Sequence, residues 1–343
     1  MADDGEPTPV TNPFTGMHIN DTAFLQDVQG RSPCVRCNKS RKFFCYGSGC
    51  YVPVAELTGR VPFVKLPIKI DIIKHRSEIE GKSTAVHAAV LAPEDVTIFT
   101  YPDIPDYRQE EGVVLIFPTP DALTVASLFS GETLKFKDNY GLPKGYHIGT
   151  LLKCKLNDLV AEEDNDEDNA EKKCQHDALA HRLPVRKAVF IDSTWSQCRG
   201  IYKDERVGCL QTVVIQNRIS QFWRHQKDSP RWFLATVEAI HQFLIELHIT
   251  AYGLDERYQG LQHLGYLNFP KDKVVPADRV REEGEPEPYN GQYDNLLFFF
   301  LHMYNLIHEY YEHHTLRAYR RPLFLEDKYQ KKLLEQQKRE ESV

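Results

Sequence analysis

Four cysteines stand close together near the start of the chain, with the spacing Cys34-x2-Cys37-x7-Cys45-x4-Cys50. A Cys-x2-Cys turn supplies two thiolates to one metal ion, and a tetrahedral Zn²⁺ site needs four such ligands at one point. Basic residues between these cysteines favour thiolates, because positive charge lowers a thiol pKa. The spacing therefore predicts a structural zinc site. Free buried thiols are the alternative, since the Cys45-x4-Cys50 half is wider than a usual knuckle.

A second group that could do chemistry follows the apolar run in "KAVFIDSTWSQC" (187–198). The run ends in Asp192, Ser193, Thr194 and Trp195. Such polar residues are preferred at helix N-termini, and Thr194 with Gln197 has the spacing of a capping box. Capping alone would explain them, and a Trp beside a helix start more often packs in a core. A functional role for these residues is the alternative to capping.

Three further segments place polar residues next to predicted element ends. "IKHRSEIEGKST" (73–84) is predicted to be a loop, "IFPTPDA" (116–122) ends a strand, and "QFWRHQKDSPRWFLATVEA" (221–239) leads into a helix. Their candidate site residues are Lys74, His75, Arg76, Phe117, Pro118, Arg224, Arg231, Thr236 and Glu238. Solvated surface charge remains the simpler interpretation for most of the cations.

The elements that would position these residues alternate along the chain. Short apolar runs at 112–117, 187–191 and 210–216 each stop at turn or cap residues, and the first two are followed by helical patterns. Strands that alternate with helices favour an α/β sheet, in which ligands bind at the carboxyl ends of the strands. Asp192 lies at such an end.

Two long helices are predicted from apolar residues at helical spacing. In 232–249 one face carries Val237, Ile240, Leu244 and Leu247. In 293–314 the matching positions are Leu296, Phe300, Met303, Ile307 and Tyr311, and the excess of aromatic residues indicates more than one buried side. Between the two helices, 253–292 is rich in Gly, Pro and charge and is predicted to be a long loop.

Composition bounds the class of protein. The chain has 343 residues, 41% of them hydrophobic, with no apolar run near the roughly 20 residues of a spanning helix. A membrane protein is therefore not expected. The acidic, polar start lacks the features of a signal peptide, so we expect a reducing, nucleocytoplasmic compartment in which the cysteines are thiols or metal ligands.

Charge and composition divide the chain into segments, although the net charge is only −7. Residues 1–30 are predicted to be a flexible leader, 31–60 a cysteine-rich module, and 61–316 the catalytic domain. Seven acidic residues in 161–173 predict a disordered insertion, and 317–343 is a basic tail. A local basic surface for nucleic acid remains possible despite the overall charge.

Together these motifs resemble the DTW-domain family of the TDD superfamily, whose signature is Asp-x-Thr-Trp after a strand, here 192–195. Further family features occur in the same order: a cysteine group, a Lys-His-x-x-Glu element, a Phe-Pro strand end and a Thr-x-Glu-Ala helix start. Here these are Cys34, Cys37, Cys45 and Cys50; Lys74, His75 and Glu78; Phe117 and Pro118; Thr236, Glu238 and Ala239. The resemblance spans residues 31–250. The wide Cys45-x4-Cys50 spacing and the acidic insertion depart from the pattern.

The resemblance implies an α/β fold of the SPOUT-like knotted type, preceded by an N-terminal cysteine module that binds zinc. It implies transfer of the 3-amino-3-carboxypropyl group of S-adenosylmethionine to N3 of a tRNA uridine, in the D-loop at position 20, with release of methylthioadenosine. S-adenosylmethionine would be the co-substrate, Zn²⁺ a structural ion and tRNA the partner, in the nucleus. No membrane or obligate protein partner is expected.

Roles for the candidate residues follow from this expected reaction. The catalytic candidates are Asp192, Thr194 and Trp195, with Asp192 either removing the uridine N3 proton or shaping the cofactor loop. Cofactor contacts are expected from Ser193, Thr194, Phe117, Pro118, Thr236 and Glu238, and phosphate contacts from Lys74, His75, Arg76, Arg224 and Arg231. Two alternatives stay open: an S-adenosylmethionine-dependent RNA methyltransferase, and a zinc-containing RNA-binding protein without catalysis.

Overall fold

A parallel β-sheet lies at the centre of the computed structural model, which describes residues 12–47, 49–119, 121–130, 183–216, 218–226, 229–264, 271–281 and 283–321. The order of its six strands is β4-β3-β7-β5-β8-β6, and every neighbouring pair is parallel. The strands are β3 (Lys69–Lys74), β4 (Val96–Thr100), β5 (Val113–Ile116), β6 (Leu123–Thr124), β7 (Lys187–Asp192) and β8 (Gln211–Val214). The expected α/β class and the three strands predicted from apolar runs are confirmed.

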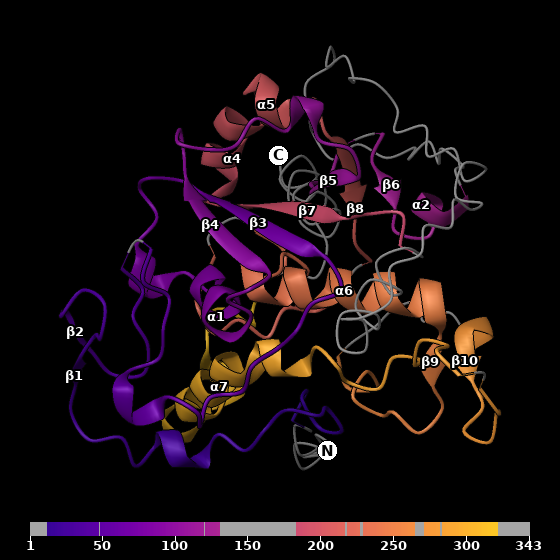
Figure 1. The fold of residues 1–343 in the computed structure, drawn as a ribbon. Coiled ribbons are helices and arrows are strands. Elements are labelled where there is room, and N and C mark those ends of the chain that lie inside the picture. The colour runs from indigo at the N-terminus through magenta and orange to yellow at the C-terminus, as the bar shows by residue number, and fades with distance from the viewer. Residues whose placement is uncertain are drawn as a thin grey trace, which may run out of the picture.

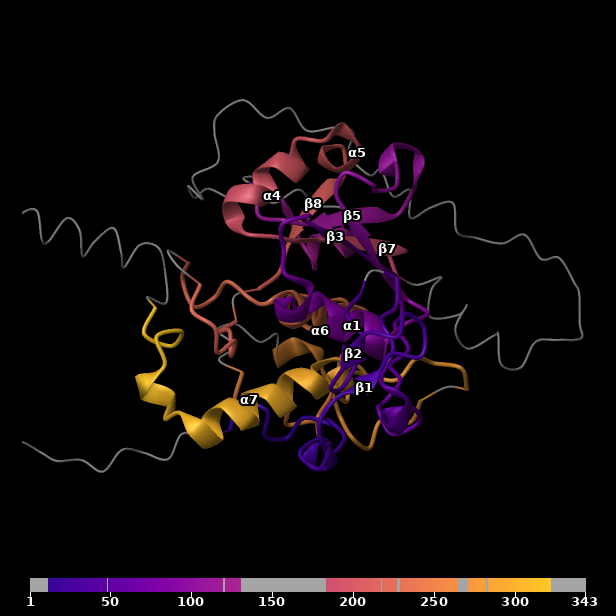
Figure 2. The ribbon, with the colours of Figure 1, turned by 90° about the vertical axis from the view of Figure 1, so that its left-hand side faces the viewer.

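Helices cover both faces of this sheet (Figure 1). On one face lie α4 (Trp195–Tyr202) and α5 (Glu205–Gly208), and on the other lie α1 (Ala85–Leu91) and α6 (Thr236–Tyr252). A second helical layer, α7 (Phe298–Tyr310), lies beyond α1 and α6, as Figure 2 also shows. Burial on both faces explains why strands such as β5 are continuously apolar.

The helix predicted over 232–249 corresponds to α6, and its apolar stripe is core. Val237, Ile240, Leu244 and Leu247 are all fully buried. In α7 the predicted stripe is right for Phe300 but wrong for Tyr311, which lies beyond the helix end and is 55% exposed. Three consecutive aromatic residues at the start of α7 are buried instead, so the expectation of more than one buried side holds.

The segment 73–84 is a loop only in part. Its first two residues end β3, a strand that the sequence analysis did not predict because charged residues interrupt the apolar run. One of these charges, Asp71, is buried, and its carboxylate accepts the Tyr107 hydroxyl at 3.1 Å. Lys187 lies 3.4 Å from the same carboxylate. A paired charge is compatible with a central strand.

Residues 12–30 are not a flexible leader. Phe14 is 5% exposed and packs edge-on against Phe300 and Tyr304 of α7. The His18 N–H donates to the Asp294 carboxylate at 2.8 Å. The few apolar side chains of this segment are thus buried against α7. Of the predicted leader, only residues 1–11 lie outside the described structure.

The basic tail begins later than predicted. Ala318 and Tyr319 are buried, and the Tyr319 hydroxyl donates to the main-chain carbonyl of Gln221 at 3.1 Å. Arg321 is also buried and donates to carbonyl oxygens of the segment before α6. Residues 322–343 and the predicted acidic insertion 161–173 lie outside the described residues.

Short elements complete the described chain. The cysteine module contains the antiparallel pair β1 (Ser32–Pro33) and β2 (Ser40–Arg41), and the segment predicted as a long loop contains the parallel pair β9 (Leu254–Asp255) and β10 (Val274–Val275). Helix α2 (Ser127–Ser130) follows β6. Single 3₁₀ turns occur at 23–25, 55–57, 80–82, 107–109, 271–273, 294–297 and 313–315.

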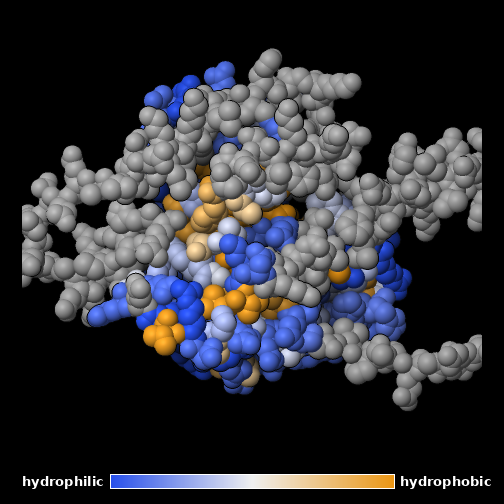
Figure 3. All heavy atoms as spheres, turned by 90° about the vertical axis from the view of Figure 1, so that its right-hand side faces the viewer, coloured by the Kyte–Doolittle hydropathy of each residue, from blue (hydrophilic) through white to orange (hydrophobic). Residues whose placement is uncertain are grey.

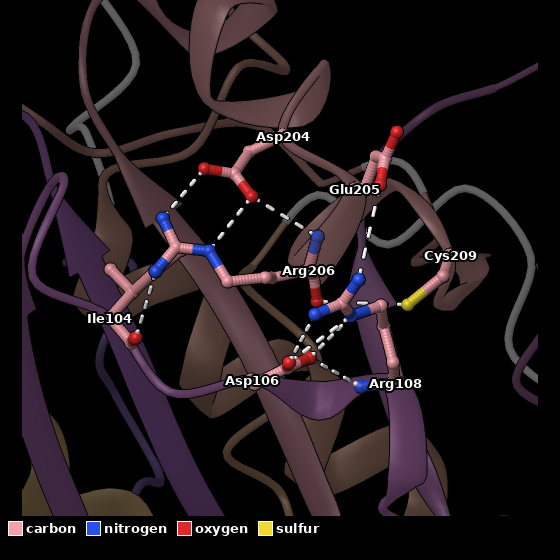
Figure 4. A network of polar contacts seen from close by, with 7 residues as sticks. All are labelled: Ile104, Asp106, Arg108, Asp204, Glu205, Arg206 and Cys209. Atoms are coloured by element: carbon pink, nitrogen blue, oxygen red, sulfur yellow. Dashed lines mark hydrogen bonds and ion pairs between the residues drawn. The ribbon is translucent and has the colours of Figure 1, made fainter.

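Polar contacts fix the loop after β4 to the helical layer above the sheet (Figure 4). The guanidinium of Arg206 in α5 binds the Asp204 carboxylate at 2.7 Å and donates to the carbonyl of Ile104 at 3.2 Å. Arg108 pairs with Asp106 at 2.6 Å.

One side of the molecule shows mainly hydrophilic residues among the grey atoms, with apolar residues toward its middle (Figure 3). In the described part of the chain, no helix combines the length and apolarity needed to cross a membrane.

We predict that Phe14→Ala lowers the free energy of unfolding by about 3 kcal/mol, because it removes a buried aromatic ring from the α7 surface. Tyr310→Ala is the matched control. Tyr310 is an aromatic residue of α7, and its side chain is 74% exposed. This control should change stability by less than about 0.5 kcal/mol. Urea unfolding measures both, and equal effects of the two substitutions would contradict packing of the N-terminal segment.

Candidate active site

The carboxyl ends of β3, β5 and β7 meet at one edge of the sheet. Lys74, the last residue of β3, is in register with Asp192, the last residue of β7, and the His75 N–H donates to the Asp192 carbonyl at 3.0 Å. In the strand order, the connection from β3 leads to β4 at one end of the sheet, and the connection from β5 leads to β6 at the other end. Ligands of open α/β sheets bind where such connections diverge.

The Asp192 carboxylate joins three segments that are far apart in sequence. Its Oδ2 accepts the Ser83 hydroxyl at 2.7 Å, and its Oδ1 accepts the Thr236 hydroxyl at 2.6 Å. Asp192 is 8% exposed, so these bonds replace most of the water that the carboxylate would otherwise bind. Its side chain thus holds the start of α6 and the loop before α1 against the end of β7.

Burial has the largest effect on the pKa of Asp192. Burial raises its pKa, while the Thr236 and Ser83 hydroxyls and the charge of Lys74 act in the opposite direction without cancelling the effect. The protonated form is therefore more favoured than in an exposed aspartate. A carboxylate with a raised pKa is a stronger base once it is ionised.

Two helix N-termini meet beside Asp192. The Ala85 N–H at the start of α1 donates to the Ser83 hydroxyl at 3.1 Å. The Val237 N–H in the first turn of α6 donates to the Thr84 hydroxyl at 3.3 Å. Because the first N–H groups of a helix lack partners within the helix and carry partial positive charge, they stabilise an anion in this region.

A second carboxylate, Glu78, lies next to Asp192. Its Oε1 accepts the Thr194 N–H at 3.1 Å, and the same N–H lies 3.2 Å from Gln197 Oε1, as expected for one half of the predicted capping box. Thr194 is the N-cap of α4. Burial and the negative charge of Asp192 raise the pKa of Glu78, which is half-buried. Two carboxylates with raised pKa values are typical of functional sites.

The remaining signature residues surround this pair. The Ser193 hydroxyl donates to the Thr194 carbonyl at 3.2 Å. Trp195 is the first residue of α4, and its side chain lies outside the described structure. Phe117 follows β5, is 5% exposed and stacks on Tyr202 of α4 at 4.9 Å. Phe117 is therefore core, whereas the adjacent Pro118 is half-buried at the sheet edge.

Glu238 is not available to a ligand, contrary to its predicted role. It is fully buried, and its carboxylate accepts three donors: the Ser220 hydroxyl at 2.7 Å, the Gln221 N–H at 2.8 Å and the Ala235 N–H at 2.9 Å. These bonds connect the segment before α6 to the first turn of the helix. Glu238 therefore shapes this segment and does not face the site.

The five cations predicted to contact phosphate occupy different environments. Lys74 is 5% exposed and forms an ion pair with Glu80 at 2.9 Å, so the prediction of a surface contact is wrong for this residue. His75 is half-buried, and its Nδ1 accepts the Ser77 N–H at 3.2 Å, whereas Arg76 is exposed.

The other two cations lie on the segment before α6. Arg224 donates to the Lys82 carbonyl at 2.8 Å and lies 5.9 Å from the centre of the Phe222 ring. Arg231 lies 5.2 Å from the centre of the Tyr319 ring. Both are half-buried and remain candidates for RNA contact, together with Arg76.

The four N-terminal cysteines converge as the spacing predicts. Their sulfur atoms all lie within 4.8 Å of one another, and no other group of three or more possible metal ligands occurs in the described residues. Thiolates about 2.3 Å from a tetrahedral Zn²⁺ are roughly 3.8 Å apart, so the cluster fits this ion.

Local donors also support thiolates in this cluster. N–H groups of Arg36 and Gly47 point at the sulfurs of Cys34 and Cys45, each at 3.4 Å. Burial alone would raise the pKa of Cys34, but main-chain N–H donors and neighbouring thiols lower it to about 7. Burial and the neighbouring thiols raise the pKa of Cys50 to about 12, and a positive ion would offset this repulsion.

Two site residues, Ser83 and Asp121, were not singled out from the sequence, and Glu78 was named only as part of the Lys-His-x-x-Glu element, without a role. Ser83 donates to Asp192, and Glu78 accepts the Thr194 N–H of the same loop. Asp121 follows β5, and its Oδ2 is buried without a hydrogen-bond partner among the described residues. An unpaired buried carboxylate oxygen near the carboxyl edge is suited to accept a ligand's N–H or O–H group.

Comparisons with known proteins find one family model and several similar enzymes. Residues 42–308 match the family model named DTW domain. The chain is 39% identical to mouse tRNA-uridine aminocarboxypropyltransferase 1 over 86% of the chain and 84% of the mouse protein. The same enzyme of Homo sapiens is 38% identical over 86% of the chain and 84% of the human protein, and that of Xenopus tropicalis 38% over 83% and 82%. No solved structure matches this chain.

We predict that the free energy of unfolding of the Asp192→Asn variant rises relative to that of the unsubstituted protein as the pH increases from 4 to 8. The folded-state pKa of Asp192 lies above the ordinary value of 3.8, so ionising this group costs stability above that pH, and Asn has no such cost. Urea unfolding at both pH values measures the change.

Asp204→Asn is the matched control of opposite sign. Arg206 lowers the pKa of Asp204 to about 2, so ionised Asp204 stabilises the fold above pH 3.8 and this contribution is lost as the pH falls toward 2. At pH 8 the control should lose up to about 1 kcal/mol, because Asn keeps the helix cap but removes the charge paired with Arg206. If Asp192→Asn also became less favourable for stability between pH 4 and pH 8, the raised pKa of Asp192 would be contradicted.

Proposed function

The chain belongs to the DTW-domain family, and on this premise we propose that it is a tRNA-uridine aminocarboxypropyltransferase. The carboxylate pair Glu78 and Asp192, held at the carboxyl edge of a parallel sheet, is the observation that carries the proposal. Relatives with this activity in their names cover more than four fifths of the chain. S-adenosylmethionine is the proposed donor and uridine N3 the acceptor.

The proposed reaction needs a base at this edge. Uridine N3 carries a weakly acidic proton, and its removal produces the nucleophile that attacks the carbon bonded to the sulfonium. The N3–C bond forms as the C–S bond breaks, the electron pair remains on sulfur, and methylthioadenosine leaves. The site must present the amino-acid arm of the donor to N3 and keep the methyl group away from it.

We assign different roles to the two carboxylates. Both oxygens of Asp192 accept buried hydroxyl groups, so this residue positions the edge and stabilises positive charge near it. Glu78 is more exposed, and burial and the charge of Asp192 raise its pKa, which makes its ionised form a stronger base. Glu78 is therefore the proposed proton acceptor, and direct proton removal by Asp192 is the competing assignment.

Binding of the donor is proposed at the loops after β5 and β7. Pro118, Ser193 and Thr194 line this edge, and the unpaired Asp121 oxygen is suited to the donor's ammonium or ribose hydroxyl. Trp195 remains a proposed stacking residue. Thr236 acts through Asp192, and Glu238 is not included because its carboxylate is fully engaged.

The tRNA contacts are proposed for the exposed and half-buried cations Arg76, Arg224 and Arg231, with His75 beside them. We also propose a SPOUT-like knotted arrangement, because β7 enters the sheet between β3 and β5 and β8 enters between β5 and β6. Structural Zn²⁺ in the cysteine cluster, a D-loop target at position 20 and a nuclear location belong to the same proposal.

Incubation of the purified protein with S-adenosylmethionine and unmodified tRNA tests the proposal. We expect the aminocarboxypropyl nucleoside in the tRNA and an equal amount of methylthioadenosine, both identified by mass spectrometry. S-adenosylhomocysteine with a methylated nucleoside would favour the methyltransferase alternative. If tRNA binds but the donor stays intact, the protein is an RNA-binding module and the proposal fails.

Two variants separate the carboxylates in this assay. Glu78→Gln should lower kcat/KM by about 100-fold or more, as expected for loss of a general base, and should remove the acid limb of the pH profile. Asp192→Asn should lower the rate while keeping that limb. The opposite pattern would identify Asp192 as the base, whereas near-normal activity of both variants would exclude either carboxylate from proton transfer.

For the metal, we predict about one zinc ion per chain and none in a Cys34→Ser, Cys37→Ser double variant, because two of four ligands are lost. Elemental analysis of the purified proteins measures this content. Cys209→Ser is the matched control, since Cys209 lies outside the cluster and should leave zinc unchanged. Equal metal content in the double variant and the unsubstituted protein would refute the site.

A further inference from the structure

A cavity of about 180 Å³ lies between the cysteine module, the loop before α1, the segment before α6 and the first half of α7. Aromatic rings from three of these elements line it: Phe43, Phe44 and Tyr46 from the module, Phe222 and Trp223 before α6, and Phe299 of α7. Pockets for drug-sized ligands measure roughly 300–1,000 Å³, so this cavity suits a smaller planar group.

Two histidines of the cavity wall have ring nitrogens without partners. His87 of α1 is 7% exposed and His302 of α7 is 2% exposed. His87 Nδ1 and His302 Nε2 are buried and make no hydrogen bond to the described residues. Aromatic neighbours hold both rings, with Phe44 edge-on to His87 at 5.5 Å and Phe43 edge-on to His302 at 5.0 Å. Since both residues line the cavity, their unpaired nitrogens are candidates to hydrogen-bond a group bound there.

Both imidazoles are neutral at physiological pH. Burial and the charge of Arg224 lower the pKa of His87 to about 3, and burial and the charge of Lys42 lower that of His302 to about 4. A neutral imidazole offers one donor and one acceptor, so it can pair with either kind of group on a base edge. The rings are thus suited to hydrogen-bond an uncharged heterocycle.

The charges of the cavity wall favour a nucleic acid over a free heterocycle. Arg31, Lys42, Lys82 and Arg224 line it, against one acidic residue, Glu80, which is paired with Lys74. Proteins hold unstacked bases by combining aromatic stacking with nearby cations that contact the phosphates. A nucleotide within an RNA strand supplies both the planar base and the phosphates.

The cavity is separate from the carboxylate pair. Neither Asp192 nor Glu78 lines it, and no residue of the loops after β5 or β7 belongs to its wall. Ser83 connects the two places, because it lines the cavity and its hydroxyl donates to Asp192 at 2.7 Å. A base in the cavity would therefore lie beside the reacting nucleotide without reaching the carboxylates.

We propose that this cavity binds an unpaired base of the tRNA next to the uridine that reacts. The proposal rests on the proposed function for the position of the reacting uridine. Stacking between the aromatic rings and hydrogen bonds to His87 and His302 hold this neighbouring base, which fixes the strand so that uridine N3 faces Glu78.

A double-substitution cycle on protein and RNA tests the proposal, with tRNA binding measured by fluorescence anisotropy in the absence of S-adenosylmethionine. The RNA probes are unmodified tRNA and transcripts with an abasic site 5′, 3′ or at the reacting uridine. If no transfer occurs in the activity assay, each unpaired D-loop nucleotide is made abasic in turn. Binding is thus measured whether or not the transfer reaction takes place.

On the protein, His302→Leu removes the unpaired ring nitrogen and replaces the imidazole with an apolar side chain of similar size. It should weaken binding of intact tRNA about 10-fold or more, as expected for a lost base contact. An abasic site at one flanking nucleotide should weaken the unsubstituted protein similarly and should add no further loss in the variant. His308→Leu is the matched control, because His308 lies on the same helix outside the cavity.

Lys42→Ala provides a second variant, since Lys42 is exposed and its loss should not affect folding. It should weaken binding of intact and abasic tRNA alike, because an abasic nucleotide keeps its phosphates. For His302→Leu, additive losses, coupling only at the reacting uridine, or a weaker affinity for S-adenosylmethionine alone would each overturn the proposal, as would unchanged tRNA binding by Lys42→Ala. Coupling without any transfer would support the base pocket and refute the proposed enzyme, so the two failures are distinguishable.

Discussion

The arrangement of the site depends on one buried carboxylate. Asp192 cannot stay ionised in the protein interior without hydrogen-bond donors, and two hydroxyl groups supply them, from Ser83 at 2.7 Å and Thr236 at 2.6 Å. The donors come from the loop before α1 and the first turn of α6. Satisfying one carboxylate therefore fixes two helix N-termini against the end of β7, and Glu78 is held next to them through the Thr194 N–H.

The second helical layer, α7, packs against the segments that form this edge. Helix α7 buries consecutive aromatic residues, and Phe300 contacts Phe14 of the N-terminal segment, Phe222 and Trp223. The cysteine module packs on the same helix through Phe44 and Phe299. The cysteine module, the loop before α1 and the segment before α6 thus pack on the same apolar helix, which explains how a cavity can form at their junction close to the carboxylates.

Parts of this arrangement could be predicted from the sequence because they depend on local spacing. The periodicity of α6 identified its buried face, and the turn chemistry after 187–191 located the end of β7. β3 was missed, because the charge of Asp71 is compatible with a central strand only once Tyr107 and Lys187 are seen to pair with it. Packing of residues 12–30 was missed for a similar reason, since the surface that buries Phe14 lies nearly 300 residues away.

The sequence by itself determined the cysteine cluster, the α/β class and the place of Asp192 at a strand end, because neighbours within a few residues decide turns, caps and metal knuckles. Only the tertiary structure decided which residues contact Asp192, that Lys74 and Glu238 are engaged inside the protein, and that two histidines with an unpaired ring nitrogen line a cavity. The reason is physical: burial and hydrogen bonding set the charge and availability of a polar side chain, and both depend on segments that meet only when the chain folds.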